Sequence, residues 1–260
     1  MKNLKKQWQF IWTFAKNDFK SRYSSSQLGI FWAFCRPVVM ALVYIFVFTV
    51  VARASTLDSG YPYALWLLPG LVAWFVISEA ITSATTALAD YSYLVKKVNF
   101  DVEYLPRIKT VSAFIVHGFF VMLILFIYLL WGMPVKWEML QILYYILCTF
   151  CITAAIGKIT CAIYPFFKDI TALNEIILMI LMWGTPVMWS IDILPDNFVS
   201  LFKLNPFFYL VEGYRQAFMG TGWLWNDLWM GLYFWIVTIC LTWLGNKFFK
   251  KLSVHFADLI

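Results

Sequence analysis

The sequence has little charge and lacks the motifs that would let the chain carry out chemistry alone. Only 13% of its 260 residues are charged, whereas an average soluble domain has about 25%. The pattern G-x-x-x-x-G-K-[ST], with which phosphate-loop proteins hold ATP, is absent, and so are HExxH and GxSxG. The sequence therefore argues against an enzyme with a familiar site and against ATP binding of the phosphate-loop type.

Cysteine and histidine are also scarce, and neither predicts a metal site. The five cysteines all lie in apolar segments. Cys148 and Cys151 have CxxC spacing, but no second pair and no histidine flanks them, so we expect them to be packing residues. His117 stands alone in an apolar segment and His255 lies near the chain end, so structural roles are expected for both. We predict no bound metal and no cofactor.

Apolar sequence is abundant: 62% of the residues are hydrophobic and 20% are aromatic, with a mean hydropathy of +0.75. One crossing of a bilayer needs roughly 20 apolar residues. We therefore predict an all-α membrane protein with one domain, 1–260. The six expected membrane spans are 28–51, 64–89, 110–131, 139–164, 171–191 and 227–246. The second span is the least regular, because Pro69, Gly70 and Glu79 interrupt it.

Lysine and arginine are unevenly distributed between the two sides of this map. Seven lie in the segment that ends at Arg36, four lie within 88–109, two are Lys158 and Lys168, and three follow the last span. The other side holds only Arg53, Lys136, Lys203 and Arg215. Positive residues favour the cytoplasmic side of a membrane, so both termini are expected there. The net charge of +6 is then expected to face lipid headgroups and cytoplasmic partners, not nucleic acid.

The first 22 residues predict an amphipathic helix. They lack the uninterrupted apolar core and the cleavage site of a signal peptide. The apolar residues that recur at helical spacing are Leu4, Trp8, Ile11, Trp12, Ala15 and Phe19. A helix with two tryptophans on one face is expected to lie in the membrane interface. It is either a plain anchor or a helix that also frames a binding surface for a cytoplasmic subunit.

Two segments between spans are more apolar than ordinary loops. The segment 90–109 is expected to be a docking surface on the cytoplasmic side or a helix on the lipid surface. The external segment 192–225 is divided by Pro195, Pro206 and Gly220, which predicts two short helices. Its apolar residues predict that these helices are re-entrant and packed into protein.

Three stretches resemble one known family. The first is RYSSSQLGIFWAF at 22–34, followed by Pro37; the second is FKDI at 167–170. The third is the series TPV at 185–187, LP at 194–195 and NP at 205–206. Together they resemble ABC-2 type permeases that export polysaccharides, over essentially the whole chain. Arg36 departs from the residues that the family usually has before the proline.

This resemblance implies a homodimer with the ABC-2 fold of type V exporters, bound to two copies of a cytoplasmic ABC ATPase that binds ATP and magnesium. The substrate would be a glycan on a polyprenyl-pyrophosphate lipid, with O-antigen as the first expectation. Teichoic acid, capsule or a small lipid or drug are the alternatives. The chain would be a permease of the bacterial inner membrane, not an enzyme. A motor-free channel or membrane enzyme is the rival from another class.

The resemblance also implies roles for particular residues. Those expected to contact the ATPase are Tyr93, Leu94, Lys97, Val98, Asn99, Phe100, Leu105, Phe167, Lys168 and Asp169. Aromatic rings can stack on sugars, and any single ring can instead face lipid or the protein core. The aromatic residues expected to line the channel and its gate are Trp32, Tyr44, Trp74, Phe75, Trp183, Trp189, Phe198, Phe207 and Tyr214.

Overall fold

The computed structural model describes residues 2–24, 26–51, 62–96 and 100–260, and all regular elements in these ranges are helices. Five of the described helices are long and apolar enough to cross a membrane. They are α2 with its continuation η1 (Phe31–Phe46, Val47–Val51), α3 (Tyr63–Thr85), α6 (Tyr104–Leu130), η2 with α7 (Trp137–Gln141, Ile142–Ile163) and α11 (Leu228–Leu252). The prediction of a multi-pass, all-α membrane protein is confirmed.

The expected count of six spans is not confirmed. The fifth expected span, 171–191, corresponds to α8 (Ile170–Gly184), which has 15 residues and is shorter than the roughly 20 that a span needs. The helix stops because Thr185 precedes Pro186, and a following proline disfavours the helical conformation. Thr185 accordingly has φ −112° and ψ 89°, outside the helical region.

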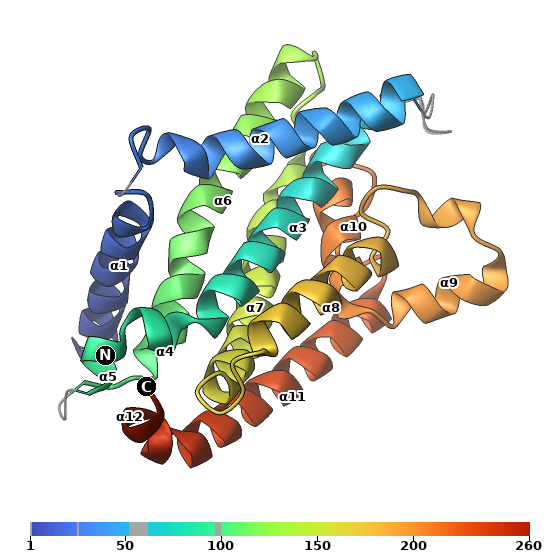
Figure 1. The fold of residues 1–260 in the computed structure, drawn as a ribbon. Coiled ribbons are helices and arrows are strands. Elements are labelled where there is room, and N and C mark those ends of the chain that lie inside the picture. Colours follow the sequence, from blue (N-terminus) through green and yellow to red (C-terminus); the bar gives the residue numbers. More distant parts are fainter. Residues whose placement is uncertain (1, 25, 52–61, 97–99) are drawn as a thin grey trace.

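The central helix of the bundle is α3, which packs against α6, α7, α8 and α10. Figure 1 shows it in the middle of the molecule. The residues from Leu65 to Trp74 are almost all buried, as expected for a helix that is apolar on every side. Pro69 lies inside the helix without ending it. The second expected span is therefore present despite its irregular sequence.

On the outside of the bundle, α2 crosses over α6 and α3 at a steep angle (Figure 1). Ala33 is the only buried residue of this helix. Phe34, Val38 and Ile45 are partly buried against the core, whereas Leu42 and Phe46 are exposed and therefore face lipid or another protein surface.

Both ends of the chain lie at the same end of the bundle (Figure 1). The predicted N-terminal helix is present as α1 (Lys2–Tyr23) and packs on α6. Its buried face differs from the expected one, because Ile11 and Ala15 point inward whereas Trp8 and Trp12 are exposed. The exposed tryptophans are in a position to meet the membrane interface.

The segment 192–225 forms two helices, as predicted. The first, α9 (Asp196–Lys203), projects from the bundle in Figure 1. The second, α10 (Pro206–Met219), is largely buried against α3, α7 and α11. It ends at Gly220, whose φ of +61° is a left-handed conformation that favours glycine.

Candidate functional site

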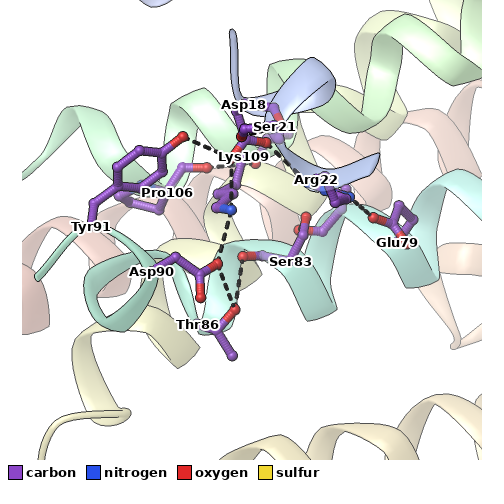
Figure 2. A network of polar contacts seen from close by, with 12 residues as sticks. Asp18, Ser21, Arg22, Glu79, Ser83, Thr86, Asp90, Tyr91, Pro106 and Lys109 are labelled. Atoms are coloured by element: carbon purple, nitrogen blue, oxygen red, sulfur yellow. Dashed lines mark hydrogen bonds and ion pairs between the residues drawn. The ribbon is translucent and has the colours of Figure 1, made fainter. Parts of the chain in front are cut away.

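A polar cluster joins α1 to three other helices at the end of the bundle that carries the termini (Figure 2). Asp18 of α1 is buried, and its Oδ1 lies 2.7 Å from Nζ of Lys109 on α6. The same Nζ lies 2.8 Å from Oδ2 of Asp90, the last residue of α4 (Ala87–Asp90). The hydroxyl of Tyr91 donates to Asp18 Oδ1 at 2.8 Å. These contacts fix α1, α4 and α6 to one another.

Arg22, near the end of α1, extends the cluster to α3. Its Nη2 lies 3.1 Å from Oδ2 of Asp18, and its Nη1 pairs with Oε1 of Glu79 on α3. Glu79 is the acidic residue that interrupts the second expected span. The structure gives it a structural partner from a neighbouring helix.

Asp18 and Arg22 each have a shifted pKa, and both shifts favour the charged form. Burial alone would raise the pKa of Asp18, but the charge and the hydrogen bond of Lys109, together with the charge of Arg22, outweigh burial and lower the pKa below 3.8. Burial likewise lowers the pKa of Arg22, but the charges of Glu79 and Asp18 outweigh it, so the net shift is upward. Buried Lys109 and half-buried Arg22 thus form a network of ion pairs with Asp18, Asp90 and Glu79.

A second buried cation, Lys158 of α7, ties the same end of the bundle together. Its Nζ lies 2.5 Å from Oε1 of Glu103, which precedes α6, and 2.6 Å from Oδ1 of Asn246 on α11. Burial of Glu103 would raise its pKa, but the bond and charge of Lys158 outweigh burial and lower it. A force applied at this end would therefore act on several spans at once.

The predicted coupling segment, 90–109, is not a single helix. It contains the end of α4, the short α5 (Ser92–Val95) and the beginning of α6 at Tyr104. Leu94 and Leu105 are buried in an apolar cluster shared with α1. Packing within the chain explains their apolar character, so neither offers a partner a direct contact.

Only some of the other residues predicted to contact the ATPase are exposed. Tyr93 is exposed, and Phe100 is half-buried with its ring centroid 6.2 Å from that of Phe10 on α1. The turn between α7 and α8 exposes Phe167, Lys168 and Asp169. Lys97, Val98 and Asn99 lie outside the described residues. An ATPase surface at these residues stays a prediction.

Towards the other end of the bundle, Arg215 of α10 holds the non-helical segment that follows α8. Its buried Nη2 donates to the carbonyl oxygens of Pro186 at 2.8 Å and Val187 at 2.6 Å. The guanidinium carbon lies 3.5 Å from the ring centroid of Trp66, a cation–π arrangement. Arg215 also pairs with Glu212, three residues earlier in α10, but at 3.4 Å this is the longest of its polar contacts.

Asn205 joins the same region from the start of α10. Its Oδ1 accepts from the N–H of Phe207 at 3.0 Å and caps the helix. Its Nδ2 donates to Oγ1 of Thr185 at 2.6 Å. The TPV and NP motifs therefore meet in space. The sequence pointed to both motifs, but it carried no signal for this contact or for the bonds of Arg215.

The aromatic residues predicted to line the channel differ in how deeply they are buried. Trp74, Phe207 and Tyr214 are buried in the core of the chain, and such interiors are close-packed, so these rings line no channel in this conformation. The hydroxyl of Tyr214 lies 2.8 Å from Nε2 of His117, which gives the histidine its structural partner. Trp32, Trp183 and Phe198 are exposed, whereas Tyr44, Phe75 and Trp189 are half-buried.

The RYSSSQLGIFWAF motif lines a cleft between α1, α2, α3 and α6. The cleft has a volume of about 350 Å³, and Arg22, Tyr23 and Trp32 form part of its wall. Arg36, the departure from the family pattern, lies on the same wall and is exposed. The motif therefore shapes the joint between the N-terminal helix and the first span.

The apolar helices of span length define a multi-pass membrane protein. Residues 9–219 match the model of the family described as ABC-2 type transporter. The chain therefore belongs to the ABC-2 type transporter family, as its motifs predicted.

Several relatives share most of the chain's length. The chain is 25% identical over 253 residues to the O-antigen export system permease protein RfbA of Klebsiella pneumoniae, covering 94% of this chain and 92% of the relative. It is 26% identical over 247 residues to the RfbA protein of Myxococcus xanthus, covering 94% and 93%. It is also 21% identical over 211 residues to the polysialic acid transport protein KpsM of Escherichia coli, covering 78% of each.

Proposed function

We propose that this chain is the membrane-spanning subunit of an ATP-driven exporter that moves a lipid-linked polysaccharide out of the cytoplasm, with O-antigen as the substrate. Two copies form the path, and two copies of a separate ABC ATPase bind ATP and magnesium and drive transport. The glycan travels on a polyprenyl-pyrophosphate lipid. The chain itself binds no cofactor and catalyses no reaction. Both termini face the cytoplasm, because most basic residues lie on their side.

One observation carries this proposal: the similarity to O-antigen export permeases runs through 94% of the chain. We call the network of Asp18, Lys109 and Asp90, together with the contacts of Lys158, the ion-paired base. The base offers a physical route for coupling. Because Lys109 and Lys158 tie α1, α4, α6, α7 and α11 together, movement of a bound ATPase would shift these helices as a body.

A permease for another substrate on the same fold is the alternative. The similarity to the polysialic acid transport protein favours a capsule polysaccharide as the second candidate. Teichoic acid and a small lipid or drug remain substrates of the same class of permease.

The test is complementation of a strain that lacks the chromosomal copy of this permease. We expect the chain, expressed with its genomically adjacent ATPase, to restore the glycan at the cell surface. An ATPase variant that cannot hydrolyse ATP should leave the glycan inside the cell. Restoration with the inactive ATPase would overturn the proposal, and so would an unchanged surface glycan in the deletion strain itself.

A further inference from the structure

A cleft of about 350 Å³ lies beside α10 at the end of the bundle away from the termini. It is formed at the first turns of α3, α7 and α11 and at the loop that follows α10. The volume falls within the range of small-ligand sites. The cleft is distinct from the ion-paired base and takes no part in the contacts of that cluster.

The floor of this cleft is aromatic. Trp66, Tyr145, Phe208 and Tyr209 line it and are buried. Trp223, from the loop after α10, lines the cleft and is only half-buried, with its ring stacked on Trp225 at a centroid distance of 4.4 Å and an angle of 8°. Aromatic faces of this kind pack on the C–H surface of a sugar ring.

The rim of the cleft is polar. The amides of Gln216 and Asn226 line it, and their side chains make no hydrogen bond to another described residue. An amide offers donors and an acceptor together, which suits neighbouring hydroxyl groups of a sugar. Asp192 and Asp227 add carboxylate oxygens, and each bonds only locally, to Ser190 or to the first turn of α11.

The loop that carries the rim is held in place from behind. Nε2 of Gln141 donates to the carbonyl of Gly222 at 2.9 Å, and its Oε1 accepts from the N–H of Leu224. Nζ of Lys136 donates to the carbonyl of Gly220 at 3.2 Å. The site is therefore shaped before any ligand arrives, which lowers the entropy cost of binding.

The cleft carries net negative charge. Asp192, Glu212 and Asp227 line it, against the single cation Lys203. Arg215 neutralises part of Glu212, yet the two aspartates still outnumber the lysine. A polyanionic glycan would meet like charge here, whereas a neutral or amino sugar would not.

We infer that this cleft is a saccharide-binding site that accepts neutral or amino sugars of the exported glycan and rejects acidic ones. The inference rests on the proposed export function and deepens it, because it assigns this permease to glycans without uronic acid, sialic acid or phosphate in the repeat. Among capsule polysaccharides it excludes a sialic acid polymer, because such a polymer would meet like charge in the cleft.

Binding to the purified full-length chain in nanodiscs tests this inference. The probes are tetrasaccharides of mannose, glucose, N-acetylglucosamine and glucosamine, and a sialic acid tetramer of the same length, each titrated by ligand-observed NMR. We expect saturable binding of at least one neutral or amino probe in the millimolar range or tighter. The sialic acid tetramer should bind at least about tenfold more weakly than that probe.

Variants locate the binding. Gln216→Ala and Trp223→Ala should each weaken the bound probe about tenfold, from loss of hydrogen bonds and of stacking. Gln9→Ala and Trp243→Ala are matched controls that lie outside the cleft and should leave affinity unchanged. Asp192→Asn should reduce the difference in binding affinity between the neutral and the acidic probes. A melting curve of each variant separates lost binding from lost folding.

Three results would overturn the inference: no saturable binding of any probe, equal binding of the acidic and neutral probes, or unchanged affinity in both cleft variants. None of these results tests the export proposal, for which the measurement is the amount of glycan at the surface of the complemented strain. If export is restored while the cleft variants bind and export normally, the cleft assignment fails and the export function stands.

Discussion

Asp18 and Lys109 form an ion pair of 2.7 Å between α1 and α6, with side chains only 3% and 8% exposed. The N-terminal helix is therefore attached to the spans by a buried charge and does more than anchor the chain to the membrane surface. That this helix also frames a binding surface for a cytoplasmic subunit stays a prediction.

Lys109→Ala should destabilise the protein by about 3 kcal/mol, because it removes the more buried of the two cations that pair with Asp18 and leaves only Arg22. The measurement is thermal unfolding of the detergent-solubilised protein. Arg107→Ala is the matched control: it removes a cation from the same helix, in a pair with Glu103 that is exposed on both sides, and should cost about 1 kcal/mol or less. Equal effects of the two substitutions would contradict the role assigned to Lys109.

Acidification should weaken the same contact. The pKa of folded Asp18 lies below the ordinary 3.8, so its charged form contributes stability above pH 3.8 that is lost as pH falls through the folded pKa. Glu103 contributes in the same direction. We expect the unfolding temperature to fall between about pH 5 and about pH 3, and to fall less in Asp18→Asn. An identical pH profile in that variant would show that Asp18 is not the titrating group.

Gly70→Ala should disturb the hydrogen bonds that Arg215 donates to the carbonyl groups of Pro186 and Val187. A Cβ at this position of α3 would lie 3.0 Å from Nη2 of Arg215 and 3.3 Å from Cγ1 of Val211, so the guanidinium would have to move. Overpacking of this kind costs about 1–3 kcal/mol, and we expect lower thermal stability and reduced export. Gly118→Ala, with open space around the added carbon, is the control and should leave both unchanged. A wild-type melting temperature in Gly70→Ala would contradict a stabilising role for these hydrogen bonds of Arg215.

Phe167→Asp should abolish co-purification of the partner ATPase, because it places a charge in the exposed turn between α7 and α8. Phe198→Asp changes an equally exposed aromatic on α9, which the proposed topology places on the external side, and should retain the ATPase. Both variants should still insert in the membrane. If Phe167→Asp retained the ATPase, the docking surface would not include this turn.

Helix positions were largely predictable, because apolar runs of span length and the proline and glycine breaks are local signals. The N-terminal helix, the regular spans and the two helices of 192–225 all followed from them. The end of α8 did not: the apolar run continues to Ile191, but the effect of Pro186 on Thr185 stops the helix at Gly184.

The candidate site was less predictable, because its contacts join residues far apart in the sequence. Nothing local distinguishes Leu94, which packs beneath α1, from an exposed docking residue, since both are apolar. Arg215 showed one visible partner three residues away, whereas its shorter bonds go to carbonyl groups, which every residue carries. Spacing within a helix can suggest an ion pair, but not a partner supplied by the fold.

The most direct test of the export proposal is transport in liposomes that contain this chain and its partner ATPase. The substrate is a polyprenyl-pyrophosphate glycan carrying a radioactive label, and the readout is its movement to the leaflet or lumen opposite the ATPase. We predict movement only with ATP and with an active ATPase. Equal movement by the permease alone, without ATPase or ATP, would contradict the account and identify a motor-free channel.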